Sequence, residues 1–347
     1  MEKKTDKKLV APPQKRKLTG EKLSRYVEKI LEERGKKALE IARQAVFEEE
    51  EKLECKEARK ALHYFMNSYW NDTTRPALLS IACEALGGNP DITTPIAVPL
   101  ILISGAVDIH DDIIDQSKIK RNRPTVYGKF GKEMALLVGN ALLFKGFTLL
   151  HEARRKIQPE LLQIIFQLIK ESFFELGEAE ALELSLKNRK DVTIEEYLAV
   201  VRKKAADFEA YMCISAILAN GLEEEIEALG RYGRILGMLI ILGDDNSDML
   251  DPSEMVNRIK NEVLPLPILY ALHEPNLKKK LMPILQKKKL TRKNAENILD
   301  LIYTAGVFKE VEAIFKNMIK KGKRSLKFMK KRNNYLLMQI LESTYPK

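Results

Sequence analysis

The chain has 347 residues, of which 45% are hydrophobic and 31% charged, so it is long enough to bury a large core. Its three cysteines, Cys55, Cys83 and Cys213, have unrelated spacings, which argues against a disulfide framework and favours a reducing, cytoplasmic setting. The longest apolar run, residues 95–107, contains two prolines and is shorter than the ~18 residues that a membrane span needs.

The formal net charge of +10 is concentrated partly in the two ends of the chain. Residues 1–22 read MEKKTDKKLVAPPQKRKLTGEK, and residues 316–332 read KNMIKKGKRSLKFMKKR. We interpret residues 1–20 as a basic, disordered tail. Contact of the basic ends with an acidic membrane surface stays open as an alternative. No nucleic-acid-binding motif accompanies the positive charge, so we expect no nucleic-acid partner.

Helical periodicity runs through almost all of the remaining chain, and no run of alternating β-branched residues interrupts it. A capping-box pattern of Thr193 and Glu196 and a first-turn Pro159 mark two helix starts. We expect helices over residues 22–52, 54–69, 76–87, 93–118, 131–156, 159–188, 193–219, 223–250, 264–273, 290–304 and, with breaks, 306–343. The sequence therefore predicts a single all-α domain over residues 21–347, built from about ten or more long helices.

Two short segments of these helices, DIHDDIIDQS and LIILGDDNSDML, carry three aspartates each at positions i, i+1 and i+4. They are Asp111, Asp112 and Asp115 in the first segment and Asp244, Asp245 and Asp248 in the second. This spacing places the three carboxylates on one side of a helix, and each segment ends an apolar run that belongs in a core. Hard cations such as Mg²⁺ bind carboxylate oxygens together with substrate phosphates. We interpret the segments as a magnesium site for a diphosphate, with solvated acidic helix ends as the alternative.

The loop after the first aspartate segment is basic. The sequence KIKRNRPTVYGKFG places Lys120, Arg121 and Arg123 directly beyond the carboxylates. Arginine is suited to bidentate contacts with phosphate groups. We therefore expect this loop to contact the diphosphate, and a solvated basic loop is the alternative.

Together these motifs resemble those of the trans-isoprenyl diphosphate synthases, the polyprenyl synthetase family. HDDIIDQSKIKRNRPTVYGKFG is similar to the family's first aspartate-rich region and its Arg-Arg-Gly-x-Pro-Thr loop, and GDDNSDML to its second. Residues 203–210, KKAADFEA, resemble the Lys-Thr-Ala segment between them. Residues 75–88, RPALLSIACEALGG, resemble the end of the Gly-Gly-Lys-Arg region. The resemblance extends from about Arg75 to Pro267.

This resemblance implies a class I isoprenoid synthase fold, with helices around a central cavity, and a homodimer. It also implies that an allylic prenyl diphosphate ionises beside three Mg²⁺ ions and condenses with isopentenyl diphosphate (IPP). All six aspartates of the two segments would then bind metal. The residues that it makes catalytic are Asp111, Asp112, Lys203 and Asp244. Those that it places at the substrates are Arg75, Lys120, Arg121, Lys203 and Lys204.

The same resemblance assigns the floor of the chain pocket to the residues four and five positions before the first aspartate. In this sequence they are Val107 and Ala106, and neither is aromatic. Because these modest side chains leave the channel open below the diphosphate, we expect a product of C20 or longer.

The departures from the family pattern concentrate on the IPP side. Asp72 stands at the position of the IPP-binding lysine, Ser104 at that of a histidine or glutamine, and Ile241 at that of a glutamine. A carboxylate about 4 Å from a diphosphate costs about 1–4 kcal/mol. Three interpretations stay open: chain elongation with IPP, ionisation for cyclisation or for transfer to another acceptor, and a non-catalytic subunit of a heteromeric prenyl synthase.

Overall fold

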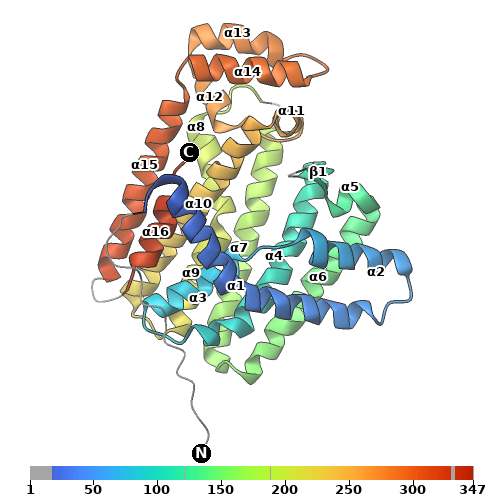
Figure 1. Cartoon of the computed structure of the whole chain (residues 1–347), viewed down its shortest axis with the longest axis vertical. Helices are drawn as coiled ribbons and strands as arrows, with labels where there is room; N and C mark the ends of the chain where they lie inside the picture. The colour runs from blue at the N-terminus through green and yellow to red at the C-terminus, as the bar shows by residue number, and fades with distance from the viewer. Residues whose placement is uncertain (1–17, 121, 188, 330–332, 347) are drawn as a thin grey trace, which may run out of the picture.

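The computed structural model describes residues 18–120, 122–187, 189–329 and 333–346, and its architecture is helical throughout (Figure 1). Sixteen α-helices lie within these residues, together with one antiparallel hairpin of two-residue strands. The prediction of an all-α fold is therefore confirmed. Residues 1–17, which make up most of the predicted basic tail, lie outside the described residues.

The α-helices are α1 (Gly20–Glu50), α2 (Lys56–His63), α3 (Thr74–Ala85), α4 (Thr94–Ile114), α5 (Val126–Phe130), α6 (Lys132–Glu152), α7 (Pro159–Leu186), α8 (Ile194–Lys204), α9 (Ala206–Leu218), α10 (Glu223–Leu250), α11 (Pro252–Asn261), α12 (Leu266–His273), α13 (Pro275–Leu285), α14 (Arg292–Thr304), α15 (Phe308–Ser325) and α16 (Tyr335–Ser343). A π-helical segment, η1 (Tyr64–Tyr69), follows α2 directly, and short 3₁₀ segments are η2 (Pro90–Thr93), η3 (Ala153–Arg155) and η4 (Leu326–Met329). The strands are β1 (Ile119–Lys120) and β2 (Arg123–Pro124).

Most observed helices match the expected ranges, and the capping box at the start of α8 is present. Glu196 N donates to Thr193 Oγ1 at 3.1 Å, and Thr193 N donates to the Glu196 carboxylate at 2.8 Å. α5, α11 and α13 lie outside the expected helix ranges. The start of α11 has a local signal, because Asp251 Oδ1 accepts a hydrogen bond from Ser253 N at 2.8 Å and Pro252 occupies the first turn.

Two apolar clusters form the core, one around α10 and the other around α4. α4 and α6 approach closely because glycines of α6 face α4. A Cβ atom at Gly139 would lie 2.5 Å from His110 Nε2, and one at Gly146 would lie 2.5 Å from Ile103 Cγ1. α4 and α10 end at the same end of the bundle, next to the hairpin and α11 (Figure 1). The close packing of α4 therefore fixes the position of the aspartates at its C-terminal end.

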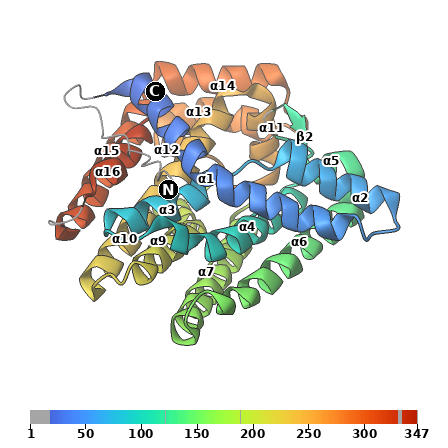
Figure 2. The same cartoon turned by 60° about the horizontal axis from the view of Figure 1, so that its bottom comes forward.

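Two segments, Pro90–Ile114 and Lys132–Arg155, are long and apolar enough to cross a membrane by length and composition alone. Polar residues interrupt both segments, so neither is the continuous apolar run that the sequence was expected to show for a membrane span. The most apolar window of the first segment is 72% buried in the protein, whereas that of the second is only 33% buried. α4 thus owes its apolar character to its place in the core. α6 and its neighbour α7 lie together at one edge of the molecule (Figure 2).

Candidate active site

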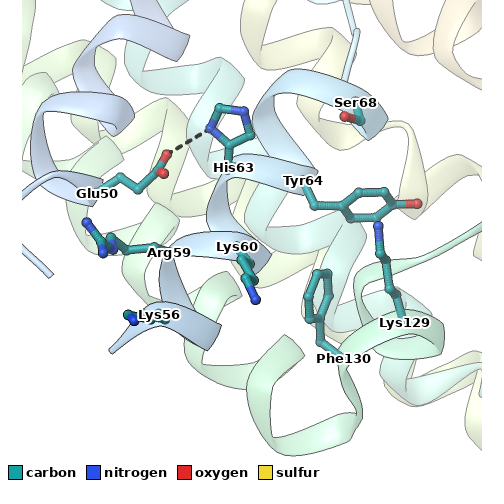
Figure 3. Close-up of a pocket in the computed structure, with 9 residues that line it drawn as sticks. All are labelled: Glu50, Lys56, Arg59, Lys60, His63, Tyr64, Ser68, Lys129 and Phe130. Atoms are coloured by element: carbon teal, nitrogen blue, oxygen red, sulfur yellow. Dashed lines mark hydrogen bonds and ion pairs between the residues drawn. The ribbon is translucent and has the colours of Figure 1, made fainter. Parts of the chain in front are cut away.

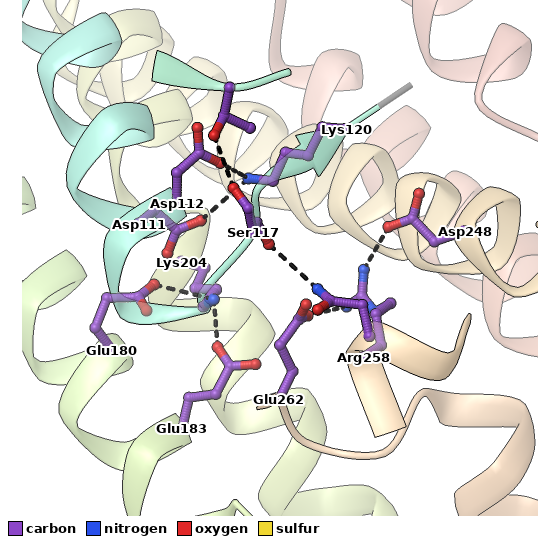
Figure 4. Close-up of polar contacts among 12 residues, drawn as sticks. Asp111, Asp112, Ser117, Lys120, Glu180, Glu183, Lys204, Asp248, Arg258 and Glu262 are labelled. Atoms are coloured by element: carbon purple, nitrogen blue, oxygen red, sulfur yellow. Dashed lines mark hydrogen bonds and ion pairs between the residues drawn. The ribbon is translucent and has the colours of Figure 1, made fainter. Parts of the chain in front are cut away.

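The two aspartate segments come together at the ends of α4 and α10 (Figure 4). Asn257 Nδ2 of α11, which follows the second segment, donates a hydrogen bond of 3.3 Å to Oγ of Ser117, the last residue of the first segment. Ser117 is held in turn by Thr125, whose Oγ1 donates to the Ser117 carbonyl oxygen at 2.8 Å. The chain segments that leave the two helices are therefore tied to each other.

Lys120 on β1 pairs with the first segment. Its Nζ lies 2.7 Å from Asp112 Oδ1 and 3.8 Å from Asp111 Oδ2. Asp112 is 1% exposed, and burial raises its pKa to about 7 although Lys120 opposes this shift. Burial alone would lower the pKa of Lys120, but Asp108, Asp112 and Asp111 outweigh it and raise that pKa well above its usual value. The hairpin thus delivers a fully charged ammonium group to these carboxylates.

Lys204, the last residue of α8, lies among carboxylates of α7. Its Nζ is 2.9 Å from Glu180 Oε1 and forms a second ion pair with Glu183. Burial would lower the pKa of Lys204, but Glu183, Asp111 and Glu180 outweigh it and raise that pKa well above its usual value. Burial would likewise raise the pKa of Asp111, but Lys204 and then Lys120 outweigh it and lower that pKa. Lys204 was predicted to bind substrate, and in the structure its charge is compensated by the protein.

Several of these carboxylic acids are hard to ionise in their present surroundings. Burial, followed by the charges of Asp111 and Glu262, raises the pKa of Asp115 to about 9. Burial also raises the pKa of Glu180 to about 7. Burial is the largest cause of both shifts, and neighbouring carboxylates add to it.

Arg258 of α11 pairs with two aspartates of the second segment. Its Nη2 lies 2.6 Å from Asp245 Oδ1 and 3.1 Å from Glu262 Oε2, and its Nη1 lies 2.7 Å from Asp248 Oδ2. The hydroxyl of Tyr197 donates a hydrogen bond to the other carboxylate oxygen of Asp245. Asp245 is therefore saturated by two partners, whereas Asp244 on the same turn of α10 is exposed.

Arg75, on the side of the site where IPP was expected, is also compensated internally. Its Nη1 lies 2.8 Å from Asp72 Oδ2, its Nε lies 2.9 Å from Asp207 Oδ2, and its guanidinium carbon is 5.0 Å from the ring centroid of Phe208. Asp72 Oδ1 additionally accepts a hydrogen bond of 2.8 Å from Thr74 N at the start of α3. Asp72 was expected to face a diphosphate, but its carboxylate is turned toward Arg75 and the helix end.

The remaining predicted residues occupy different surroundings. Lys203 pairs at 2.7 Å with Glu178, which is 59% exposed. Ala106 is fully buried in α4 and Val107 is half-buried. Arg121 lies outside the described residues. Ser104 is buried and within 2.8 Å of the Tyr211 hydroxyl, so its hydroxyl group has a partner inside the protein.

The donor set fits a hard cation, although internal cations pair with it in this structure. Asp111 Oδ1 and Asp112 Oδ2 are shielded from water and accept no hydrogen bond from the described residues. Oxygen atoms of this kind are the ligands that Mg²⁺ prefers. Across the described part of the chain, however, no three Asp, Glu, His or Cys side chains are already grouped as metal ligands. A metal ion at the first segment would therefore have to compete with Lys120 and Lys204.

The sequence analysis did not identify Glu180, Glu183, Arg258 and Glu262 as site residues. The two glutamates lie three positions apart on α7, which places them on one face of the helix. That spacing is a weak signal, because acidic helix faces are common on protein surfaces. Arg258 follows Asp248 by ten residues, on a helix that the periodicity did not reveal.

Replacing Arg258 with methionine should destabilise the protein, because Asp245, Asp248 and Glu262 would then face one another without a cation. Removing one partner of a buried ion pair costs about 3–5 kcal/mol, and we expect the free energy of unfolding to fall by that order in the presence of EDTA. Millimolar Mg²⁺ should restore more stability to the variant than it adds to the unmodified protein. Denaturant unfolding with and without Mg²⁺ measures both effects.

The matched control is Arg292→Met, which removes an exposed ion pair with Glu296 on α14. Pairs of this kind contribute about 0.3–0.5 kcal/mol, so this variant should remain close to the unmodified protein. Equal losses in the two variants, or an equal response to Mg²⁺, would contradict the role that we assign to Arg258.

Comparison with known proteins identifies relatives of this chain. The family model for polyprenyl synthetase matches residues 56–302. A geranylgeranyl diphosphate synthase from Methanosarcina mazei is 33% identical over 211 residues, which cover 60% of this chain and 64% of that protein. A short chain isoprenyl diphosphate synthase from Methanothermobacter thermautotrophicus is 34% identical over 185 residues, or 53% of this chain and 56% of that protein. The matched regions thus span less than two thirds of both curated relatives.

A solved structure extends the likeness to almost the whole chain. The crystal structure of geranylgeranyl pyrophosphate synthetase from Pyrococcus horikoshii superposes with a TM-score of 0.76 at 26% sequence identity. The superposition covers 92% of this chain and 97% of that one. The helical bundle described above is therefore the isoprenoid synthase fold. With the family model matching well over half of its residues, the chain belongs to the polyprenyl synthetase family.

Proposed function

We propose that this protein is a Mg²⁺-dependent prenyltransferase that ionises an allylic prenyl diphosphate and condenses it with IPP to a polyprenyl diphosphate of C20 or longer. The observation that carries the proposal is the meeting of two aspartate segments and their cationic partners at the end of an apolar core. The names of the two curated relatives agree with this reaction class. An apolar core next to charged groups suits a substrate with a hydrocarbon chain and a diphosphate head.

The proposed metal ligands are the six aspartates of the two segments, and we propose three Mg²⁺ ions. Bound Mg²⁺ would neutralise the diphosphate as it leaves. Lys120, Lys203 and Lys204 are proposed to contact the same diphosphate, together with Arg121. The observed pairing of Lys120 with Asp111 and Asp112 supports this, because the ammonium group is already where negative charge gathers. Asp111, Asp112, Asp244 and Lys203 are the residues that we propose as catalytic.

The acceptor is proposed to be IPP, whose double bond attacks the allylic cation before a proton is lost. Arg75 would hold the IPP diphosphate, and to do so it must exchange one of its carboxylate partners, Asp72 or Asp207, for the ligand. That internal pairing favours a second candidate, in which the allylic cation cyclises or reacts with an acceptor other than IPP. A non-catalytic subunit of a heteromeric synthase is the third, and the two intact aspartate segments speak against it.

An incorporation assay separates these candidates. The protein is incubated with Mg²⁺, radiolabelled IPP and, in turn, each allylic diphosphate from C5 to C20, and we expect the label in a chain of C20 or longer. Asp112→Asn keeps the shape of the side chain and removes its charge, so it should lower the rate at least about 100-fold. Release of diphosphate without incorporation of label would support the second candidate. If no diphosphate is released from any substrate, only the third candidate, a non-catalytic subunit, would remain.

The proposed chain pocket is tested through Ala106. Enlarging this fully buried residue to phenylalanine should block the channel below the diphosphate and shorten the product, and Ala106→Val should shorten it less. Overpacking a core position costs about 1–3 kcal/mol, so the thermal stability of both variants is measured alongside the products. A folded Ala106→Phe variant with the unmodified product distribution would contradict the placement of the pocket at Ala106 and Val107.

We also propose that the protein acts as a homodimer in the cytoplasm, and a heteromer is the alternative assembly. The support for self-association is an exposed apolar face on α6 and α7, where Phe144 is 75% and Phe174 is 77% exposed. A cavity of about 480 Å³ between these helices is lined largely by apolar and aromatic side chains, among them Phe147 and Phe173. Exposed apolar patches of this kind usually mark interfaces.

The proposed cytoplasmic location has separate support. The three cysteines are free, which agrees with a reducing compartment.

The double variant Phe144→Glu/Phe174→Glu should convert a dimer of the 39.7 kDa chain into a monomer, because two charges would enter the apolar face. Light scattering coupled to gel filtration measures the mass. The control is Tyr303→Glu, which changes an equally exposed aromatic residue (76%) on α14 and should leave the dimer intact. Dimers that persist in the double variant would contradict this interface.

A further inference from the structure

A second cavity, of about 570 Å³, lies among side chains of α2, η1 and α5 (Figure 3). Its walls come from the last residue of α1, from α2, from η1 and from α5. It shares no lining residue with the aspartate segments. Two hydrogen bonds join its wall to the hairpin: Tyr64 Oη donates to the Pro124 carbonyl oxygen at 2.5 Å, and Arg123 Nη1 donates to the Ser68 carbonyl oxygen at 3.2 Å.

The lining of this cavity is strongly basic. Lys56, Arg59, Lys60 and Lys129 all line it, whereas Glu50 is its one carboxylate and is paired with His63 at 3.3 Å. Among the residues that the structure describes, no carboxylate lies within ion-pair distance of Lys56, Arg59 or Lys60. This contrasts with the aspartate site, where every lysine and arginine described above is paired with a carboxylate.

Two of these basic residues on α2 repel each other. Lys56 and Lys60 are four residues apart on a helix of eight residues, and Arg59 lies between them on the same side. Like charges at this spacing destabilise a helix by about 0.2–0.5 kcal/mol per pair. Because no described carboxylate lies within ion-pair distance of Lys56 or Lys60, an anion from outside the protein would relieve this repulsion.

Aromatic side chains form the other wall of the cavity. The rings of Tyr64 and Phe130 meet edge to face with their centroids 5.7 Å apart, and Lys129 Nζ lies 3.7 Å from the centroid of the Tyr64 ring. Tyr64 begins the π-helix η1, and π-helical turns occur frequently at functional sites. The cavity therefore offers a positively charged side and an aromatic side that is braced by the hairpin.

We propose that this cavity is a second anion site, which binds an organic phosphate without a divalent metal. The phosphate or diphosphate group would contact Lys56, Arg59 and Lys60, because ammonium and guanidinium groups form charge-assisted hydrogen bonds with phosphate oxygens. The less polar part of the ligand would lie against Tyr64 and Phe130. A soluble organic phosphate and a phospholipid head group share this chemistry.

Titration calorimetry with inorganic pyrophosphate in EDTA tests the site on the full chain, because chelation removes the metal on which binding at the aspartates depends. The variant is Lys56→Gln/Lys60→Gln, in which both residues are exposed, so the fold should be unaffected. We expect its affinity for pyrophosphate to fall at least about tenfold, since two charged donors are lost. Lys279→Gln/Lys280→Gln on α13 removes the same charge from another exposed lysine pair and should change the affinity less than about twofold.

Sedimentation with phosphatidylcholine vesicles containing phosphatidic acid distinguishes the two sources of phosphate. If the unmodified protein binds pyrophosphate and only the α2 variant loses this binding, the result supports a soluble ligand. If the unmodified protein binds the vesicles but not pyrophosphate, and only the α2 variant loses vesicle binding, the result supports a lipid head group in the same cavity. Equal losses in both double variants would show attraction to net charge alone and would overturn the proposal, as would an unmodified protein that binds neither probe.

Discussion

The structure depends on one electrostatic constraint: carboxylates gathered at the buried ends of two core helices are tolerated only if cations lie among them. Lys120, Lys204 and Arg258 supply those cations, and each comes from a different element. The hairpin carries Lys120, the end of α8 carries Lys204, and α11 carries Arg258. The helices and loops around α4 and α10 are therefore positioned by ion pairs as well as by apolar packing, and they meet where the proposed reaction would take place.

This compensation affects how a metal ion would enter the site. A divalent ion about 6 Å from a fixed ammonium group is repelled by roughly 5 kcal/mol at an effective dielectric of about 20. Lys120 and Lys204 therefore oppose metal binding as long as no diphosphate is present. A diphosphate reverses the balance, because its oxygens attract the lysines and the metal alike. In the proposed reaction, the substrate thus helps to assemble the site that binds it.

Local patterns predicted the parts of the site that lie on one helix, and failed where the partner comes from elsewhere. The aspartate spacing and the apolar runs before it indicated both segments, and Lys120 was found because it follows the first segment closely. Arg258 was not predicted, since only the folding of α11 against α10 brings it to Asp245 and Asp248. Asp72 was expected to repel a diphosphate because the sequence does not show that Arg75 and the start of α3 already hold its carboxylate.

The two basic regions next to the hairpin differ in a way that the fold alone does not explain. In the aspartate site, Lys120 is surrounded by carboxylates whose burial requires it. In the second cavity, Lys56 and Lys60 repel each other on a short helix and have no carboxylate within ion-pair distance among the described residues. Solvation makes such a pair tolerable but gives no reason for it to face an aromatic-walled cavity. A phosphate-bearing ligand accounts for both the unpaired charges and the aromatic wall beside them, and the hairpin would then contact both anion sites.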